Sequence, residues 1–499
     1  MSGFDEFLVW CYGGVLVVLG VYGTHRYVMV YLFYKYRHRR PVPLRRFERL
    51  PSVTVQLPVY NEAIVVARLI QAVGRLDYPR ESLEIQVLDD SDDETTEIAA
   101  REVAKLRAEG LEIRHVRRGE RKGFKAGALE YGLKSARGEF IAIFDADFVP
   151  PSDIVTRIID HFTDPGVGMV QVRWGHLNRE FSLLTRLQSI FLDGHFMIEH
   201  TARNRSGRFF NFNGTAGIFR RTCIEDAGGW QHDTLTEDLD LSYRAQLKGW
   251  KFVYLPDVIS PAELPVEMTA FKSQQHRWAK GSIQTSRKIL PVIWRSSVPL
   301  KVKLEATLHL TNNMAYLLML LLCALMLPAL HMRALGGSAW FGTLFNFSIF
   351  MAATSSVVSF YVVSQREIYS GWWRQLKYLP ALLSLGIGLA VNNSRAVLEA
   401  LCSRQAVFVR TPKYGVCGAG SRPSRRYAGT ARLLTVAFEL LLGVYFAGLV
   451  TYTIMQGWWV SAFFLSLFAC GFLYVGVASL PAAHVARGHG AGHGSASGT

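Results

Sequence analysis

The sequence predicts a soluble α/β domain with a mainly parallel sheet, embedded in an all-α transmembrane bundle. Three observations support this prediction. Mean hydropathy is +0.15, and 50% of the 499 residues are hydrophobic, which is unusual for a soluble protein. The apolar excess is confined to the two ends of the chain, and the segment between them alternates strand and helix patterns.

The first apolar run covers residues 7–33 and is interrupted by His25 and Arg26. It is long enough to cross a bilayer, and six basic residues follow it between Lys35 and Arg46. A signal peptide would carry its positive charge before the apolar run. The positive-inside rule places the basic side in the cytoplasm, so we expect an external N-terminus. Residues 1–47 are predicted to form a transmembrane helix with a basic juxtamembrane segment.

Residues 48–290 have the pattern of an α/β domain. Apolar strand patterns end close to polar or acidic clusters, and helical patterns separate them. A sheet of this kind is mainly parallel and covered on both faces, and ligands bind beyond the carboxyl ends of its strands. The predicted strands are 53–57, 83–88, 113–116 and 140–144, and the predicted helices follow Glu62 or cover 96–109 and 125–135.

The C-terminal third, 291–481, is predicted to be a transmembrane block. Its apolar runs are 308–331, 343–364, 378–392, 433–455 and 459–480, and all but 378–392 are long enough to span. The loop 402–431 holds six Lys or Arg and no acidic residue, so it is expected in the cytoplasm. We therefore interpret 370–401 as an interfacial or re-entrant helix and predict five spans, with six as the alternative. Residues 482–499 are predicted to be a disordered tail.

Charge and cysteine content exclude other classes. The six cysteines are scattered and form no C-x-x-C pair, which argues against a disulfide scaffold or a zinc site. The net charge of +15 is concentrated beside the predicted spans. That distribution is expected for a membrane protein and gives no reason to predict a nucleic-acid partner.

Two acidic clusters follow predicted strands. The strand 140–144 runs into Asp145-Ala146-Asp147, and the strand 83–88 runs into Asp89-Asp90. Two neighbouring carboxylates can hold Mg²⁺ or Mn²⁺, and the cation can neutralise a diphosphate. An isolated D-x-D is more often a solvated turn. The second acidic strand end and the nearby Lys122 and Lys125 favour a shared phosphate site.

Two later motifs each have two interpretations. Asp238, in Thr236-Glu237-Asp238, is a candidate general base, whereas the same residues could simply cap a helix. The two interpretations are compatible. In Gln274-Gln275-His276-Arg277-Trp278, Arg277 can bind a pyrophosphate and Trp278 can stack on a sugar. The alternative is a basic amphipathic helix on the membrane surface.

The order of these motifs before a transmembrane block resembles the processive family 2 glycosyltransferases, whose catalytic domain has the GT-A fold. These are the cellulose, hyaluronan, chitin and mannan synthases. Further matching segments are Gln56–Glu62, Val87–Ser91, Lys125–Leu129, Val170–Trp174 and Phe212–Gly217. Their wording is most similar to the cellulose-synthase-like A and C groups, which make β-mannan, glucomannan and β-glucan backbones. The resemblance is strong over residues 50–290.

The resemblance implies a role for each matching residue. Asp89 would contact the nucleotide base, Lys125 the diphosphate, and Asp145 and Asp147 the metal, Mg²⁺ or Mn²⁺. Asp238 would be the catalytic base beside Glu237 in the substrate site. Gln274 and Arg277 would hold the pyrophosphate and Trp278 the acceptor sugar. Phe212, Asn213, Gly214 and Thr215 would line the acceptor site. The piece 408–413 is similar to the family's gating loop, although Arg410 departs from the usual Val.

The implied activity is inverting transfer of hexose from UDP-glucose or GDP-mannose to a growing β-1,4-linked polysaccharide, which is exported through the membrane. The motifs leave the donor open. The implied protein is integral to a plasma, inner or Golgi-type membrane. A non-processive transferase acting on a lipid acceptor is the main alternative, and a receptor or channel with a nucleotide-binding module is disfavoured by the intact motifs.

Overall fold

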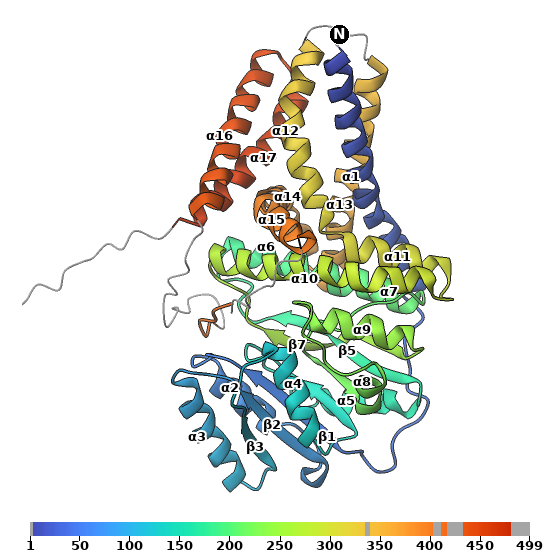
Figure 1. Cartoon of the computed structure of the whole chain (residues 1–499), viewed down its shortest axis with the longest axis vertical. Coiled ribbons are helices and arrows are strands. Elements are labelled where there is room, and N and C mark those ends of the chain that lie inside the picture. The colour runs from blue at the N-terminus through green and yellow to red at the C-terminus, as the bar shows by residue number, and fades with distance from the viewer. Residues whose placement is uncertain (1–2, 335–339, 403–410, 417–432, 481–499) are drawn as a thin grey trace, which may run out of the picture.

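The computed structural model describes residues 3–334, 340–402, 411–416 and 433–480. Figure 1 shows a sheet-containing domain at one end of the long axis and a bundle of long helices at the other. The N-terminus lies at the far end of the bundle. Further helices lie between the two parts. The domain and the bundle are therefore stacked, as the distribution of apolar residues predicts.

The seven-stranded sheet has the order β3-β2-β1-β4-β6-β5-β7. The pairs β1–β2, β1–β4, β2–β3 and β5–β7 are parallel, whereas β6 is antiparallel to β4 and β5. This confirms the mainly parallel sheet and the four strands predicted before residue 145. The strands are β1 Val53–Val59, β2 Leu83–Asp89, β3 Ile113–Arg117, β4 Phe140–Ile143, β5 Val167–His176, β6 Gly217–Arg220 and β7 Lys251–Ala262.

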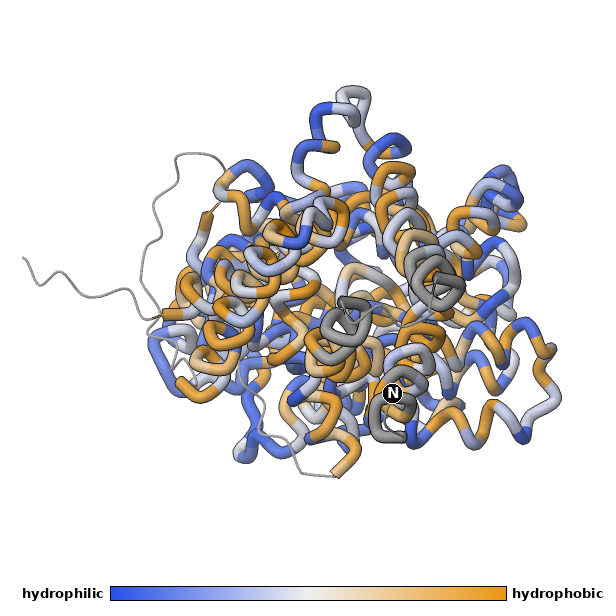
Figure 2. The backbone as a smooth tube through the Cα atoms, turned by 90° about the horizontal axis from the view of Figure 1, so that it is seen from above, coloured by the Kyte–Doolittle hydropathy of each residue, from blue (hydrophilic) through white to orange (hydrophobic). Residues whose placement is uncertain are grey.

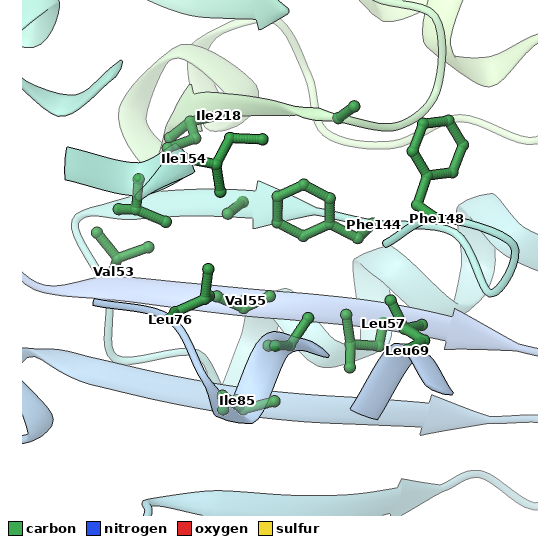
Figure 3. Close-up of a cluster of buried hydrophobic side chains, with 14 of the residues drawn as sticks. Val53, Val55, Leu57, Leu69, Leu76, Ile85, Phe144, Phe148, Ile154 and Ile218 are labelled. Carbon is green, nitrogen blue, oxygen red and sulfur yellow. The ribbon is translucent and has the colours of Figure 1, made fainter. Parts of the chain in front are cut away.

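Helices cover both faces of the sheet. The alternation of β4 shows this, because Phe140 and Ala142 belong to one core cluster and Ile141 and Ile143 to another. Figure 3 shows part of the first cluster, with Val55 of β1 on the same side of the sheet as Phe144. The first face carries α2 Val66–Gly74, α3 Thr95–Ala108 and α5 Ile154–Ile159, and the second carries α4 Phe124–Ser135, α8 Arg221–Asp226 and α9 Glu237–Leu247.

A layer of helices joins this domain to the bundle. It consists of α6 Leu183–Asp193, the π-helix η3 Gly194–His200, α7 Thr201–Arg205, α10 Met268–Arg295 and α11 Leu300–Thr311. In Figure 1 these helices lie across the long axis, above the sheet. A third core cluster contains Met29 of α1, Leu187 of α6 and Phe271 of α10. The helical layer and the bundle therefore share a hydrophobic core. The short 3₁₀ turns η1 Arg80–Ser82 and η2 Asp160–Thr163 lie within the sheet domain.

Five long helices run along the axis of the bundle (Figure 1). They are α1 Gly3–Tyr36, α12 Met314–Ala334, α13 Trp340–Ile368, α16 Leu433–Met455 and α17 Trp459–Ala478. Figure 2 looks down this axis, and hydrophobic colours predominate on helices seen end-on. Five helical segments are long and apolar enough to cross a membrane, namely Trp10–Tyr36, Ser348–Ile368, Trp372–Leu401, Leu433–Met455 and Trp459–Ala478. The chain is a membrane protein.

The segment 370–401 is divided into three pieces rather than one helix. The 3₁₀ helix η4 Trp372–Tyr378 is followed by α14 Leu379–Gly388 and α15 Ala390–Leu401. Its composition alone would permit a span. Figure 1 shows α14 and α15 lying across the direction of the five long helices, between them and α10. This orientation favours the interfacial interpretation.

Two predicted boundaries differ from the helix ends in the structure. The run 308–331 is not one straight helix, because α11 and α12 meet at a 58° bend. Asn312 and Asn313 occupy this bend. Where a helix changes direction, some backbone N–H and C=O groups lose their helical partners, and polar side chains can hydrogen-bond to them. The predicted domain boundary at residue 290 falls inside α10, which continues to Arg295 through Pro291. The apolar pattern locates the helices but not the points at which they turn.

Candidate active site

A cavity of about 820 Å³ opens where the carboxyl ends of β1 and β4 meet α9 and α10. Ten of the sequence-predicted residues line it, drawn from segments more than 150 residues apart. They are Lys125, Asp145, Asp147, Asn213, Gly214, Glu237, Asp238, Gln274, Arg277 and Trp278. Parallel strands place their carboxyl ends at one edge, so the sheet itself brings the acidic clusters together.

Each carboxylate of the D-x-D motif has an ammonium partner. Lys125 Nζ lies 2.5 Å from Asp145 Oδ1, and Lys413 Nζ lies 2.5 Å from Asp147 Oδ2. Burial alone would lower the pKa of Lys125, but Asp145 and Glu237 outweigh it and raise that pKa. Burial also raises the pKa of Asp145, although Lys125 opposes this. The floor of the cavity is thus a compact set of opposite charges at one strand end.

This pair of carboxylates fits a divalent cation that takes its remaining ligands from a substrate. Among the described residues, no group of three or more His, Cys, Asp or Glu is arranged to hold a metal by itself. Mg²⁺ and Mn²⁺ are hard cations, and Mg²⁺ in particular is commonly bound by one or two carboxylates plus phosphate oxygens and waters. Asp145 and Asp147 supply a ligand set of that size.

The loop 212–216 lies between the D-x-D motif and the predicted base and contacts both. Gly214 O accepts a hydrogen bond from Lys125 Nζ at 2.7 Å, and the Thr215 hydroxyl accepts one from Asp145 N at 2.9 Å. Gly214 has φ +81°, and a Cβ there would lie 2.9 Å from Asp238 Oδ2. Only glycine satisfies both the backbone conformation and this close approach.

Asp238 and Glu237 form the first turn of α9 beside this loop. Burial, then the neighbouring Glu237, raises the pKa of Asp238 to about 7. Burial also raises the pKa of Glu237. A general base works best when its pKa is near the operating pH, so Asp238 has the basicity that proton abstraction near neutrality requires. The carboxylate is held by a hydrogen bond of 2.8 Å from Leu239 N to Asp238 Oδ1.

The capping interpretation of Thr236 is confirmed only in position. Thr236 is the N-cap residue of α9, but its side chain makes no capping hydrogen bond. Its hydroxyl lies 3.2 Å from that of Thr285 on α10. Gly281 permits this approach, because a Cβ there would lie 2.5 Å from the methyl carbon of Thr236. Thr236 therefore fastens α9 to α10.

The Q-x-x-R-W motif lies on α10 and faces the cavity through Gln274, Arg277 and Trp278. Burial lowers the pKa of Arg277, and the carboxylates of Glu237 and Asp145 oppose that shift. Arg277 therefore faces the charged floor rather than lipid. Lys272 and Lys280 of the same helix are buried, paired with Glu439 of α16 and Glu399 of α15. The interpretation of α10 as a helix that turns its basic residues to lipid is wrong.

Three predicted residues lie behind the cavity wall. Phe212 is fully buried and packs on Phe219 with ring centroids 5.0 Å apart. Thr215 is also buried and acts through Asp145. Asp89 is buried at the end of β2, where burial would raise its pKa, but hydrogen bonds from His115 and Ser91 lower that pKa to about 2. Its neighbour Asp90 lines the cavity instead and pairs with Arg118 at 2.5 Å.

Sequence reasoning missed several residues at the site. Tyr60 lines the cavity with Arg121, whose guanidinium lies 3.2 Å from the Tyr60 ring centroid. Gln171, inside the matching segment Val170–Trp174, accepts a hydrogen bond from Asn213 N at 3.0 Å. Of the gating-type piece 408–413, residues 408–410 lie outside the described residues. Thr411 and Lys413 line the cavity. The resemblance of 408–413 to the family's gating loop was the available signal for Lys413.

Comparison with known proteins agrees with these motifs. A family model described as "Glycosyltransferase like family 2" matches residues 51–281. A probable glucomannan 4-β-mannosyltransferase 10 from Arabidopsis thaliana is 39% identical over 305 residues, covering 58% of this chain and 55% of that protein. A probable glucomannan 4-β-mannosyltransferase 7 from Oryza sativa subsp. japonica is 44% identical over 244 residues, covering 48% and 42%. The matched region thus spans about half the length of these relatives.

A solved structure shares the fold. The mannosyltransferase PcManGT from Pyrobaculum calidifontis, in complex with GDP-Man and Mn²⁺, superposes with a TM-score of 0.52 at 21% identity. The superposition covers 79% of this chain and all of that one. Together with the sheet order, this confirms the predicted GT-A fold of the central domain.

Proposed function

We propose that this chain is an inverting β-1,4-mannosyltransferase of glycosyltransferase family 2 that extends a mannan or glucomannan chain, and the family model that matches residues 51–281 supports this. The observation that carries the proposal is the single cavity that brings together D-x-D, T-E-D and Q-x-x-R-W. The names of the curated relatives favour GDP-mannose over UDP-glucose as donor, and PcManGT was solved with GDP-Man and Mn²⁺.

In this mechanism one part of the cavity activates the acceptor and another part stabilises the leaving diphosphate. Asp238 takes the proton of the acceptor hydroxyl, and the oxygen attacks the anomeric carbon. The bond between that carbon and the diphosphate breaks, and the diphosphate leaves with the electron pair. Lys125 and Arg277 offset its developing charge. A divalent cation held by Asp145 and Asp147 would supply further charge neutralisation when bound.

Trp278 and Trp174 give the cavity two aromatic walls of the kind that stack on sugar rings. An acceptor seated there would present its terminal hydroxyl to Asp238. Gln274 lies on α10 one turn before Trp278, beside Arg277. We propose that this face of α10 separates the acceptor site from the diphosphate site.

The stacking of the domain on the bundle supports a membrane synthase. Basic residues after α1 and in 402–431 support a cytoplasmic position of the catalytic domain. We propose five spans, α1, α12, α13, α16 and α17, with α14 and α15 at the interface. Coupling of synthesis to export, and a plasma, inner or Golgi-type membrane, complete the proposal.

The test uses the full chain in detergent or membranes. It is incubated in turn with radiolabelled GDP-mannose, UDP-glucose and UDP-N-acetylglucosamine, with Mg²⁺ or Mn²⁺. We expect ethanol-insoluble β-1,4-linked polymer from GDP-mannose, abolished by Asp238→Asn and by chelation, and retained in the exposed-site control Asp153→Asn. Short, lipid-soluble product would overturn processivity and favour the lipid-acceptor alternative. Incorporation from UDP-glucose alone would overturn the assignment of GDP-mannose as the donor.

A further inference from the structure

A partly buried series of hydrogen bonds and ion pairs leads from the cavity wall to the membrane helix α1. Asn213 Oδ1 lies 2.5 Å from His200 Nε2, and Asn213 Nδ2 lies 3.0 Å from His195 Nε2. His195 Nδ1 lies 3.0 Å from Glu199 Oε2. Both histidines and Glu199 belong to the π-helix η3, whose extra residue per turn is a feature found frequently at functional sites.

The charges around Glu199 keep it a carboxylate. Arg203 donates to Glu199 at 3.1 Å, and Arg26 of α1 forms a second ion pair with it. Arg203 also donates to Glu305 of α11 at 2.9 Å, which in turn pairs with His25 of α1. Two guanidinium groups thus face two carboxylates. An ionised carboxylate surrounded in this way accepts hydrogen bonds and donates none.

The ionised Glu199 carboxylate fixes the direction of each hydrogen bond from Glu199 through His195 and Asn213 to His200. Because Glu199 only accepts, His195 carries its proton on Nδ1, and its Nε2 is then an acceptor when the ring is neutral. Asn213 must therefore direct its amide nitrogen to His195 and its oxygen to His200, which donates from Nε2. Burial lowers the pKa of both histidines, to about 3 for His200. The opposite orientation of the amide would place two acceptors, His195 Nδ1 and the Glu199 carboxylate, against each other.

One N–H group of the Asn213 side-chain amide is available to a ligand in the cavity. Asn213 lines the cavity, and among the described residues its Nδ2 has His195 as its hydrogen-bond partner. An amide nitrogen carries two N–H groups, so the second remains for a ligand. Asn213 N is held separately by Gln171 Oε1, which fixes the backbone of the same residue.

We propose that His195, held by Glu199, is a positioning residue that makes Asn213 a hydrogen-bond donor to a hydroxyl of the acceptor saccharide. The inference rests on the proposed function, since it assigns the acceptor side of the same cavity. It also links acceptor recognition to α1, because Arg26 of that helix is one of the two cations that hold Glu199.

The test measures binding without catalysis. The full chain in nanodiscs is titrated with β-1,4-mannotetraose, and separately with GDP, by intrinsic fluorescence of the cavity tryptophans. His195→Leu removes the acceptor nitrogen from the chain, whereas His195→Gln can replace it, since its amide accepts from Asn213 and donates to Glu199. His161→Leu is the control, because His161 is a buried histidine on η2 that lies outside the cavity lining.

We expect His195→Leu to weaken mannotetraose binding by about tenfold, the range of one lost hydrogen bond, while GDP binding stays within twofold. His195→Gln should recover most of that loss, and His161→Leu should change neither affinity. Equal weakening of both ligands, or no rescue by Gln, overturns the inference, as does a wild-type chain that does not bind the saccharide. A wild-type chain that binds it but transfers no sugar overturns the proposed function alone.

Discussion

The proposed donor side and the membrane-facing side of the cavity are built in opposite ways. On the donor side, strand ends deliver charged residues within short motifs, and Asp145 and Asp147 belong to one tripeptide. On the membrane side, α10 is held by Lys272–Glu439 and Lys280–Glu399, pairs that are 167 and 119 residues apart. The donor side takes its carboxylates from local sequence, although Lys413 joins Asp147 across 266 residues, and the membrane side depends on long-range ion pairs.

The difference lies in exposure as well as in distance along the chain. Asp145 has a side chain 31% exposed, whereas Glu439 is fully buried. A charge that faces a cavity can keep water or a ligand, but a fully buried one depends on its partner. Substitutions on the donor side should therefore alter the reaction, and those on the membrane side should alter stability.

The largest effect is expected from the proposed catalytic base. Asp238→Asn should lower the rate of sugar transfer by about a thousandfold, within the usual contribution of a general base, and leave donor affinity near that of the wild type. Initial rates and nucleotide titration measure the two quantities. A variant that retains more than a tenth of the wild-type rate would mean that another group takes the proton.

The next effect tests the membrane side. Lys272→Met should leave the Glu439 carboxylate buried without its cation, at a cost of about 3–5 kcal/mol in the free energy of unfolding. Lys272→Met combined with Glu439→Leu should recover most of that loss, because both charges are removed. Thermal unfolding in nanodiscs gives the comparison, and a double variant as unstable as the single one would contradict it.

An intermediate effect concerns pH. Asp238 must be ionised to act, and its pKa is raised to about 7. The ratio kcat/KM should therefore fall as pH decreases below 7, by about tenfold per unit once the base is mostly protonated. Ionised Asp238 also costs stability above its ordinary pKa, so Asp238→Asn should raise the unfolding temperature at pH 8 and have little effect at pH 4. A flat profile between pH 5 and 7 would contradict this assignment.

The smallest effect calibrates the comparison. Arg157 and Asp153 form an exposed pair at 3.8 Å on α5. Arg157→Ala should change the free energy of unfolding by less than about 1 kcal/mol and should leave transfer unchanged. A loss comparable with that of Lys272→Met would mean that burial does not distinguish the two kinds of ion pair.

The donor side could be predicted from sequence because strand ends in a parallel sheet share one edge. The predicted strands 53–57, 83–88, 113–116 and 140–144 correspond to β1–β4, and Asp145 and Lys125 meet as the motifs imply. The membrane side could be predicted only in outline. Apolar runs located α16 and α17, but the direction of α14 and the bend at Asn312 depend on packing between helices.

The sequence by itself determined the fold class, the order of soluble and membrane segments and the motif residues, because hydropathy and spacing are properties of neighbouring positions. Tertiary structure alone decided that Asp90 rather than Asp89 lines the cavity and that Lys413 reaches Asp147. It also decided that His195 and His200 orient Asn213. Those contacts join segments that no local pattern relates, since burial and charge pairing are settled only when the layers pack together.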